Sequence, residues 1–258
     1  MKITVNFFWA YGSLSRLERL AINSFIYHGF DVTLWSYDRI ANIPAACQLR
    51  DAREILPEDL VFLNGKKSYA SFADLFRYAL LTKVGGLYAD TDVICLKPAE
   101  LLPRQAFLVT EQSGTRKYIK NFLRKLLGIS KPDRVNNNVI FNPAPSPGNV
   151  IDLAYHYSQH FPKDKIKWSE IGPKLLSAIV AIYPNHGYTI YHKDFANPVS
   201  QHDCPHLLLK NHALPDSAFF LHCYNEKWRQ ANMDKNAAYP EASLLGKLEK
   251  LYADAGLD

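Results

Sequence analysis

The chain has 258 residues, of which 48% are hydrophobic and 21% charged, and its formal net charge is +5. These proportions are typical of a globular protein that buries a proper core, and they exclude a disordered chain, a coiled coil and a collagen-like fibre. No apolar run approaches the roughly 20 residues of a membrane-spanning helix, and the residues after Met1 do not resemble a signal peptide. Four scattered cysteines predict reduced thiols in a cytoplasm.

The first third of the chain alternates between strand and helix signals. Residues 2–9 alternate in polarity and end on Trp9, which predicts a buried strand. A capping box at residues 15–18 predicts a helix that ends at Gly29, and residues 31–35 predict a second strand. A strand, a helix and a strand in this order predict a parallel sheet covered by a helix.

A second helix is predicted from Ser71 to the Gly85-Gly86 pair, followed by a strand with two acidic residues from Leu87 to Leu96. The rest of the chain predicts two kinds of element. Helices are predicted at about 116–127, where the helix is basic and amphipathic, and at about 149–161, 173–182 and 241–253. Short strands are predicted at 139–141, 188–192 and 218–222. No linker interrupts this pattern, so we predict a single α/β domain.

The segment with the strongest chemical signal is Asp90-Thr91-Asp92. Two carboxylates two residues apart at a strand end can converge on one hard cation, and oxygen ligands suit Mg²⁺ or Mn²⁺. Such a metal leaves coordination positions for phosphate oxygens and neutralises the charge that develops on a departing diphosphate. A D-x-D triplet also arises by chance, and solvated acids at a strand end are the alternative interpretation.

The neighbouring residues favour the metal interpretation. Asp74 and Arg77 are three apart on the preceding predicted helix and so share a face, and Tyr88 lies on the same face of the strand as Asp90. The Gly85-Gly86 pair permits a close backbone approach. These side chains are predicted to meet in one crevice at the carboxyl ends of parallel strands, where α/β sheets bind ligands.

The pattern S-x-x-D-x-x-R-x-x-x-L-x-x-x-G-G-x-Y-x-D-x-D over residues 71–92 resembles the DXD sugar-binding region of family-32-like glycosyltransferases. This group contains capsule and lipopolysaccharide enzymes, yeast α-mannosyltransferases and, more distantly, the glucosylating clostridial toxins. The resemblance implies a GT-A fold, with a Rossmann-like, mixed and mostly parallel sheet flanked by helices. It also implies a nucleotide-sugar donor, Mn²⁺ or Mg²⁺ as cofactor, and retention of the anomeric configuration. We expect a nucleotide-sugar half over about residues 1–110 and an acceptor-side half over about 111–258.

The resemblance assigns roles to individual residues of the donor site. Trp9 matches the aromatic residue that stacks on the nucleotide base, and a core tryptophan is the alternative. Asp74 and Arg77 match the acid and arginine that contact the donor ribose and sugar, and a helix-surface ion pair is the alternative. Asp90 and Asp92 match the metal and ribose carboxylates, and Tyr88 is part of the same donor-binding motif.

Three later segments carry weaker correspondences. Residues 136–138 match an asparagine-containing strand that lines the sugar pocket, which gives Asn137 a donor contact and Asn138 a place at the reaction centre; a polar loop is the alternative. Trp168 and Ile171-Gly172-Pro173 match a Gly-Pro step near the acceptor side, and a simple helix start is the alternative. His222 matches the late histidine that completes the metal shell in related folds, and an ordinary hydrogen-bonded histidine is the alternative.

The chain departs from the family in its lack of a clear acid for a covalent nucleophile. Asp133 is the nearest candidate, and it lies in a basic loop. We therefore expect front-face attack, in which the acceptor hydroxyl loses its proton to the leaving diphosphate, while the covalent mechanism stays open.

Residues 116–134 combine an apolar stripe with clustered lysines and arginines. A basic amphipathic helix suits an anionic membrane surface. Nucleic acid fits less well because no aromatic or glycine-rich reading motif accompanies the charges, so we expect no nucleic-acid partner. A helix that packs its stripe on the core is the alternative. With the membrane interpretation, the protein is expected in the cytoplasm, peripheral on the inner membrane.

The sequence thus predicts a retaining, metal-dependent glycosyltransferase that moves a hexose or N-acetylhexosamine from a nucleotide sugar, with a UDP-sugar as first choice. The expected acceptor is a capsule, O-antigen or lipopolysaccharide oligosaccharide, including lipid-linked forms. A metal-dependent nucleotidyltransferase is one alternative, although residues 9–13 do not form its phosphate loop. A non-catalytic sugar-binding or membrane-adaptor protein is another, and the intact acids and arginine of the motif argue against it.

Overall fold

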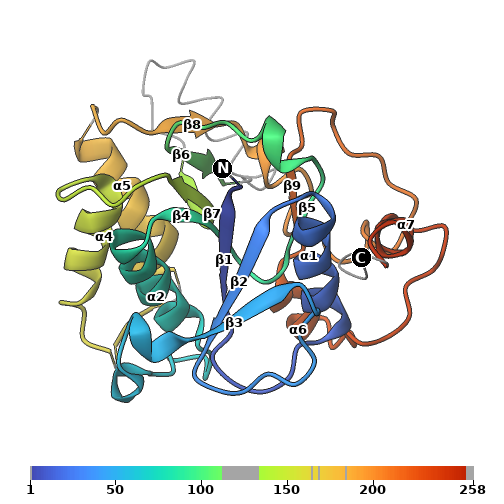
Figure 1. Ribbon diagram of the computed structural model, residues 1–258, viewed down its shortest axis with the longest axis horizontal. Coiled ribbons are helices and arrows are strands. Elements are labelled where there is room, and N and C mark those ends of the chain that lie inside the picture. The colour runs from blue at the N-terminus through green and yellow to red at the C-terminus, as the bar shows by residue number, and fades with distance from the viewer. Residues whose placement is uncertain (1, 112–133, 164, 168, 184, 254–258) are drawn as a thin grey trace.

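The computed structural model describes residues 2–111, 134–163, 165–167, 169–183 and 185–253 (Figure 1). Within them a seven-stranded sheet has the order β3-β2-β1-β4-β7-β6-β8, and a separate two-stranded sheet joins β5 and β9. The predicted helix 116–127 and the residues Asp133 and Trp168 lie outside the described residues, as does all of the basic segment except Arg134.

The predicted β-α-β opening is confirmed. Strand β1 (Thr4–Phe8) is followed by helix α1 (Arg16–Tyr27) and by β2 (Asp31–Ser36), which pairs parallel with β1. The capping box at the start of α1 is formed, with the Ser15 N–H donating to the Glu18 carboxylate at 2.8 Å. Strand β3 (Cys47–Asp51) extends the sheet in parallel with β2 and was not predicted, because its sequence CQLRD has no clear alternation.

Helix α2 (Ala70–Lys83) has the predicted position, and both glycines that follow it have positive φ values, of 70° and 90°. The prediction of one strand over residues 87–96 is wrong. The chain forms β4 (Gly86–Ala89), turns at the two aspartates, and then forms β5 (Val93–Cys95) in the second sheet. The turn is closed by the Val93 N–H, which donates to the Asp90 carbonyl at 3.0 Å. The aspartates therefore lie where the chain passes from one sheet to the other.

The other half of the large sheet comes from later in the chain. Strand β7 (Val135–Asn142) pairs antiparallel with both β4 and β6 (Phe107–Thr110), and β8 (Thr189–Tyr191) pairs parallel with β6. Strand β7 is longer than the predicted strand 139–141, so the asparagines before Val139 belong to a strand and not to a loop. The expected mixed and mostly parallel sheet is confirmed.

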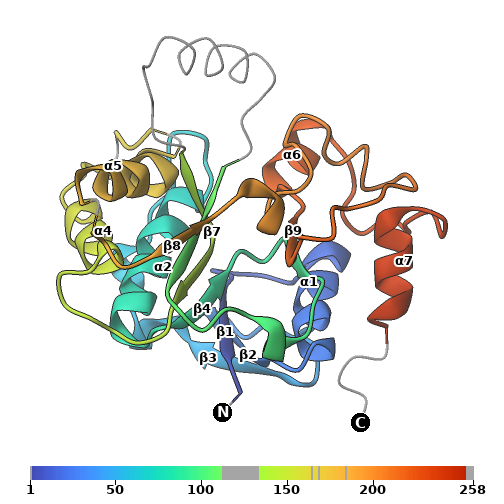
Figure 2. The same ribbon diagram turned by 90° about the horizontal axis from the view of Figure 1, so that it is seen from above.

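Helices cover both faces of the sheet (Figures 1 and 2). Helix α2 packs on one face together with α4 (Val150–Ser158) and α5 (Leu175–Ile182), and α1 lies on the other. The alternation of β1 divides its side chains accordingly, since Phe8 packs among α2 residues and Phe7 packs against Phe25 of α1. The α/β fold class predicted from the sequence is confirmed.

The C-terminal region packs against the outer side of α1 (Figure 2). It contains β9 (Phe220–His222), α6 (Asn225–Gln230) and α7 (Leu244–Leu251). Short 3₁₀ turns lie at Ala52–Glu54, Glu58–Leu60, Ala99–Leu101 and Lys193–Phe195, and a π-helical turn lies at Glu170–Lys174. Among the described residues, no helix has the length and apolar character needed to cross a membrane.

Candidate active site

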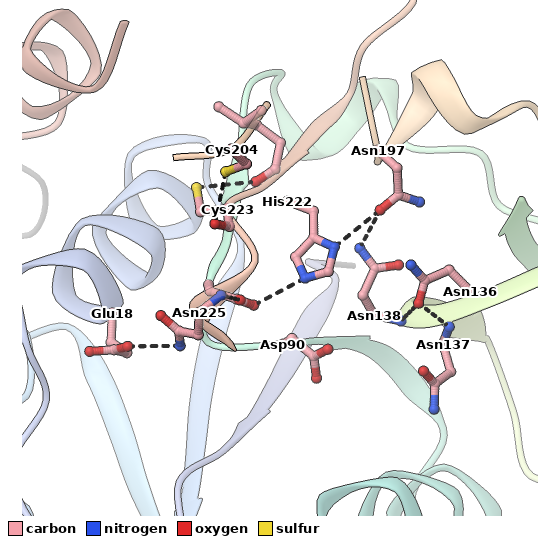
Figure 3. A network of polar contacts seen from close by, with 12 residues as sticks. Glu18, Asp90, Asn136, Asn137, Asn138, Asn197, Cys204, His222, Cys223 and Asn225 are labelled. Carbon is pink, nitrogen blue, oxygen red and sulfur yellow. Dashed lines mark hydrogen bonds and ion pairs between the residues drawn. The ribbon is translucent and has the colours of Figure 1, made fainter. Parts of the chain in front are cut away.

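Two strand ends bring the predicted metal ligands together. Asp90 follows the last residue of β4, and Asp92 directly precedes β5. Strand β9 pairs antiparallel with β5, and its register sets His222 opposite Val93. His222 therefore reaches the aspartates through a strand pairing and not through its place in the sequence (Figure 3).

Asp90, Asp92 and His222 form a group that fits a divalent cation. One potential ligand atom from each residue lies within 4.8 Å of the other two. The His222 imidazole has its Nε2 atom 3.5 Å from the Asp92 Oδ1 atom. Two carboxylate oxygens and one imidazole nitrogen are a donor set that suits Mn²⁺ and related divalent ions. The structure thus brings the three predicted metal ligands to one point.

The two carboxylates have different electrostatic surroundings. Burial raises the pKa of Asp90, and the opposing charge of Arg77 does not cancel this increase. Burial also acts to raise the pKa of Asp92, but His222, the Asn225 N–H and Lys235 together outweigh it, so that the pKa lies below its usual value. The Asn225 N–H donates to the Asp92 Oδ2 atom at 2.6 Å. Asp92 is therefore held as a carboxylate, whereas the charged form of Asp90 would be stabilised further by an additional positive charge.

Arg77 is the positive charge that already pairs with Asp90, and it projects from the buried face of α2. Its Nη2 atom lies 2.9 Å from Asp90 Oδ1 and 3.3 Å from Asp74 Oδ1, and its Nη1 donates to the Asn137 carbonyl at 2.5 Å. The guanidinium also lies 4.9 Å from the centre of the Tyr88 ring. The side chain of Arg77 is only 4% exposed. The alternative of a helix-surface ion pair is therefore wrong, because this arginine is enclosed by its partners.

Asn137 and Asn138 point to different partners from neighbouring positions of β7. The Asn137 Nδ2 atom donates to Asp74 Oδ1 at 2.7 Å, which adds the amide to the Arg77 network. The Asn138 Nδ2 atom donates to Asn197 Oδ1 at 3.0 Å. The Asn138 Oδ1 atom is buried and has no hydrogen-bond partner among the described residues. This oxygen is free to accept a hydrogen bond from a bound molecule.

Trp9 lies at the carboxyl end of β1, half-buried against the α1 side of the core. Lys235 lies near its ring, with the ammonium nitrogen 5.6 Å from the ring centre. The same ammonium donates to the buried Glu18 carboxylate at 2.5 Å, and its charge contributes to the low pKa of Asp92. Lys235 therefore places a positive charge near the predicted base-stacking residue, and this charge also acts on the predicted metal ligand Asp92.

Gly172 of the predicted Gly-Pro step lies against Asp74 of the Arg77 network. A Cβ atom added at Gly172 would stand 2.5 Å from Asp74 Oδ2 and 2.8 Å from Asp74 Cγ. The close contact explains why a glycine is needed here, whatever the role of Pro173 in starting the following helix.

Sequence reasoning missed Asn197, Glu18 and Lys235 as members of the site. Glu18 carried only a helix-capping signal, and the other two stand in segments without periodicity. They reach the site through contacts between residues far apart in the chain, since Glu18 and Lys235 are separated by 217 positions and Asn138 and Asn197 by 59. No local pattern could have found them.

Comparison with known proteins supports the sequence resemblance. Residues 19–108 match the family model described as "Glycosyltransferase sugar-binding region containing DXD motif". The matched range contains the two aspartates of the motif as well as Asp74 and Arg77, and it ends before Asn137, Asn138 and His222. The resemblance to DXD glycosyltransferases is confirmed over this region.

A relative from Acanthamoeba polyphaga mimivirus, named "Uncharacterized glycosyltransferase L373", is 33% identical over 116 residues. The match covers 45% of this chain and 43% of the relative, so the chain spans less than half of the relative's length.

Three solved structures show weak similarity. The PaToxG glycosyltransferase has a TM-score of 0.48 at 15% identity, over 71% of this chain and 69% of its own. The apo form of the glycosyltransferase GlyE of Streptococcus pneumoniae TIGR4 has a TM-score of 0.47 at 15% identity, over 100% of this chain and 61% of its own. The apo bifunctional glycosyltransferase WbbM has a TM-score of 0.49 at 13% identity, over 96% of this chain and 51% of its own. At these values the similarities carry no conclusion about the activity of this chain.

Proposed function

We propose that this chain, whose residues 19–108 match the glycosyltransferase sugar-binding region containing a DXD motif, transfers a sugar from a nucleotide sugar to a glycan acceptor with the help of a divalent metal. The observation that carries the proposal is the convergence of Asp90, Asp92 and His222 on one point, next to the Arg77 network. The nucleotide-sugar half is about residues 1–110 and the acceptor-side half about 111–258.

Asp90, Asp92 and His222 are the residues proposed to hold the metal. An imidazole nitrogen among the ligands favours Mn²⁺ over Mg²⁺, which prefers oxygen ligands. The ion supplies positive charge for the diphosphate that leaves the sugar. The donor we propose is a UDP-sugar that carries a hexose or an N-acetylhexosamine.

The proposed reaction retains the anomeric configuration by front-face attack. The bond between the anomeric carbon and the diphosphate oxygen breaks as the acceptor oxygen bonds to the same carbon. The acceptor proton passes to the leaving diphosphate, so no protein nucleophile is required. The protein has to orient the donor, and the buried contacts of Asp74, Arg77 and Asn137 keep that side of the site rigid.

The test of this proposal is a screen for metal-dependent hydrolysis of nucleotide sugars. The purified chain is incubated with UDP-, GDP- and ADP-sugars, with Mn²⁺, with Mg²⁺ or with excess chelator, and the released nucleotide is measured. We expect release from a UDP-sugar with Mn²⁺, a lower rate with Mg²⁺ and none with chelator. Full activity in chelator would contradict the metal role. Release of pyrophosphate in a parallel incubation with a nucleoside triphosphate and a sugar phosphate would favour a nucleotidyltransferase instead. Sugar binding without any turnover would favour a non-catalytic protein.

Trp9 is the residue proposed to stack on the base of the donor. Replacing it with Leu keeps apolar packing against the core but removes the aromatic face, whose stacking contributes about 1 kcal/mol. We expect Trp9→Leu to raise the donor KM roughly five-fold with a smaller change in kcat. Trp9→Phe, which keeps an aromatic ring, is the matched control and should stay close to wild type. Equal KM values for the two variants would mean that Trp9 is only a core residue.

Gly172 keeps the Asp74 carboxylate in place through its missing side chain. In Gly172→Ala the new Cβ atom overlaps the carboxylate, which Arg77 and Asn137 hold from other sides. We expect transfer to fall by up to about a hundred-fold, the cost of misplacing a group in a site by an ångström. Gly65→Ala is the control, because a Cβ atom there meets nothing within 4 Å. Wild-type rates in both variants would show that the position of Asp74 does not matter for transfer.

The acceptor we propose is a capsule, O-antigen or lipopolysaccharide oligosaccharide, in a lipid-linked form at an anionic membrane surface. The support is the composition of residues 116–134, where each Lys or Arg near such a surface contributes roughly 1 kcal/mol. Changing Lys120, Arg124 and Lys125 to Glu is expected to abolish sedimentation with anionic liposomes at low salt, with donor hydrolysis unchanged. If the wild-type chain does not sediment with these liposomes, the membrane proposal fails.

A further inference from the structure

The Asn197 side chain lies at the junction of three strands and is fully buried. Its Nδ2 atom donates to the Thr110 carbonyl at the end of β6, at 3.1 Å. Its Oδ1 atom accepts from Asn138 Nδ2 at 3.0 Å and faces His222 Nδ1 at 3.2 Å (Figure 3). The Thr110 carbonyl can only accept, so the amide nitrogen of Asn197 must face it. The orientation of the Asn197 amide is therefore fixed.

The fixed orientation selects the nitrogen at which a metal-bound His222 ring would carry its hydrogen. An amide oxygen only accepts hydrogen bonds, so once a metal takes the lone pair of Nε2, the Nδ1 atom that faces Asn197 is the nitrogen that carries the hydrogen. The Nε2 atom faces Asp92, at 3.5 Å from its Oδ1, and it is the nitrogen that a metal would bind. The tautomer set by Asn197 is the one required of a metal ligand.

We infer that Asn197 is a positioning residue for the metal site, which holds the tautomer and the ring orientation of His222. The inference rests on the proposed function, because it needs His222 to act as a ligand. Asn197 does not touch the proposed ion or substrate and acts only through its hydrogen-bond partners. Partners of this kind typically account for 10- to 100-fold in metal affinity.

The same oxygen atom also orients Asn138. Because Asn138 Nδ2 donates to Asn197 Oδ1, the Asn138 Oδ1 atom has to point the other way, where it is buried without a partner among the described residues. Asn197 thus joins the ligand on β9 to the asparagine on β7 that is predicted to line the sugar pocket. Removing its oxygen releases both side chains at once.

The test measures the His222 tautomer and Mn²⁺ affinity separately. Long-range ¹H–¹⁵N NMR of histidine-labelled protein loaded with Zn²⁺, a diamagnetic substitute for Mn²⁺, reports which ring nitrogen binds the ion and which is protonated, and His222→Gln identifies the His222 signals. We expect the Nδ1-protonated form in wild type and a loss of that preference in Asn197→Leu. Calorimetry is expected to show that Asn197→Leu raises the Kd for Mn²⁺ by roughly 10- to 100-fold.

Asn142→Leu is the matched control for the loss of a buried amide. Asn142 is also buried in β7, and its side chain makes three comparable hydrogen bonds, to the Leu81 carbonyl, Tyr188 and Asn149. It pairs with Gly86 at the far end of β4 from the aspartates. We expect Asn142→Leu to lower stability to a similar degree while the Kd for Mn²⁺ and the His222 signals stay as in wild type.

Asn197→Asp tests whether the accepting oxygen is what matters. It keeps an acceptor for His222 and Asn138 but loses the bond to Thr110, so we expect the Nδ1-protonated form and a Kd within a few-fold of wild type. A wild-type His222 that binds Zn²⁺ through Nδ1 overturns the inference, even if Asn197→Leu does not fold. Equal effects of Asn197→Leu and Asn142→Leu on the Kd, or of Asn197→Leu and Asn197→Asp, overturn it as well. A wild-type chain that binds neither Mn²⁺ nor Zn²⁺ contradicts the proposed metal site and the inference with it, whereas the other contradicting outcomes leave metal binding by the wild-type chain intact.

Discussion

Replacing Asp92 with Asn is expected to reduce transfer by roughly a thousand-fold, which corresponds to the several kcal/mol that a catalytic metal supplies. The amide removes the negative charge that binds the ion and sets N–H groups against the Nε2 atom of His222. The fold should survive, because an amide oxygen can replace the carboxylate as acceptor for the Asn225 N–H. Transfer rate, Mn²⁺ binding by calorimetry and the unfolding temperature are the three measurements.

Asp152→Asn is the control for this change. The Asp152 carboxylate also accepts a backbone N–H, from Gly148 at 2.7 Å, but it lies on α4 and away from the metal ligands. Its replacement should leave both transfer and Mn²⁺ binding unchanged. If Asp92→Asn retained metal binding and more than a tenth of the activity, the second aspartate of the motif would not be a ligand.

The variant Arg77→Ala is expected to lose stability as well as activity. It leaves Asp74 and Asp90 without the charge that compensates them, and removing one partner of a buried ion pair costs about 3–5 kcal/mol. For a chain of this size that corresponds to a fall in unfolding temperature on the order of 10 °C. The measurement is thermal unfolding together with transfer kinetics in the same buffer.

Arg53→Ala separates burial from the mere loss of an ion pair. Arg53 also pairs with two carboxylates, of Asp51 and Glu58, but its side chain is 48% exposed. Water compensates such a loss, so the unfolding temperature should stay unchanged. If Arg77→Ala kept the wild-type unfolding temperature and lost only activity, Arg77 would act on the donor and would not organise the protein around it.

The strands and helices with clear periodicity could be predicted from the sequence. The alternation of residues 2–9, the capping box of α1 and the Gly-Gly end of α2 are local signals, and each was confirmed. Strands β3 and β6 could not be found because they are short and lack alternation. The division of residues 87–96 between two sheets could not be predicted either, because an apolar pattern does not determine which strand a segment pairs with.

The site was predictable where a motif lay within one segment. The aspartates, Asp74 and Arg77 fall within 19 consecutive positions, and the structure brings them together as predicted. For Arg77 the sequence could not distinguish a surface pair from a buried one, because burial depends on β7, which covers it from elsewhere in the chain. Asn197 and Lys235 depend on such distant contacts entirely, and so they become visible only in the folded molecule.

The pairing of β5 with β9 has a consequence for how the protein is made. The contact between Asp92 and Asn225 joins positions that are 133 residues apart, and a ribosome adds residues at about 5–20 per second. A growing chain can therefore assemble β1, β2 and β4 many seconds before the segment that carries His222 has emerged. During that interval the motif lacks His222, the proposed third metal ligand. The proposed metal site can therefore be complete only after β9 has paired with β5, late in biosynthesis.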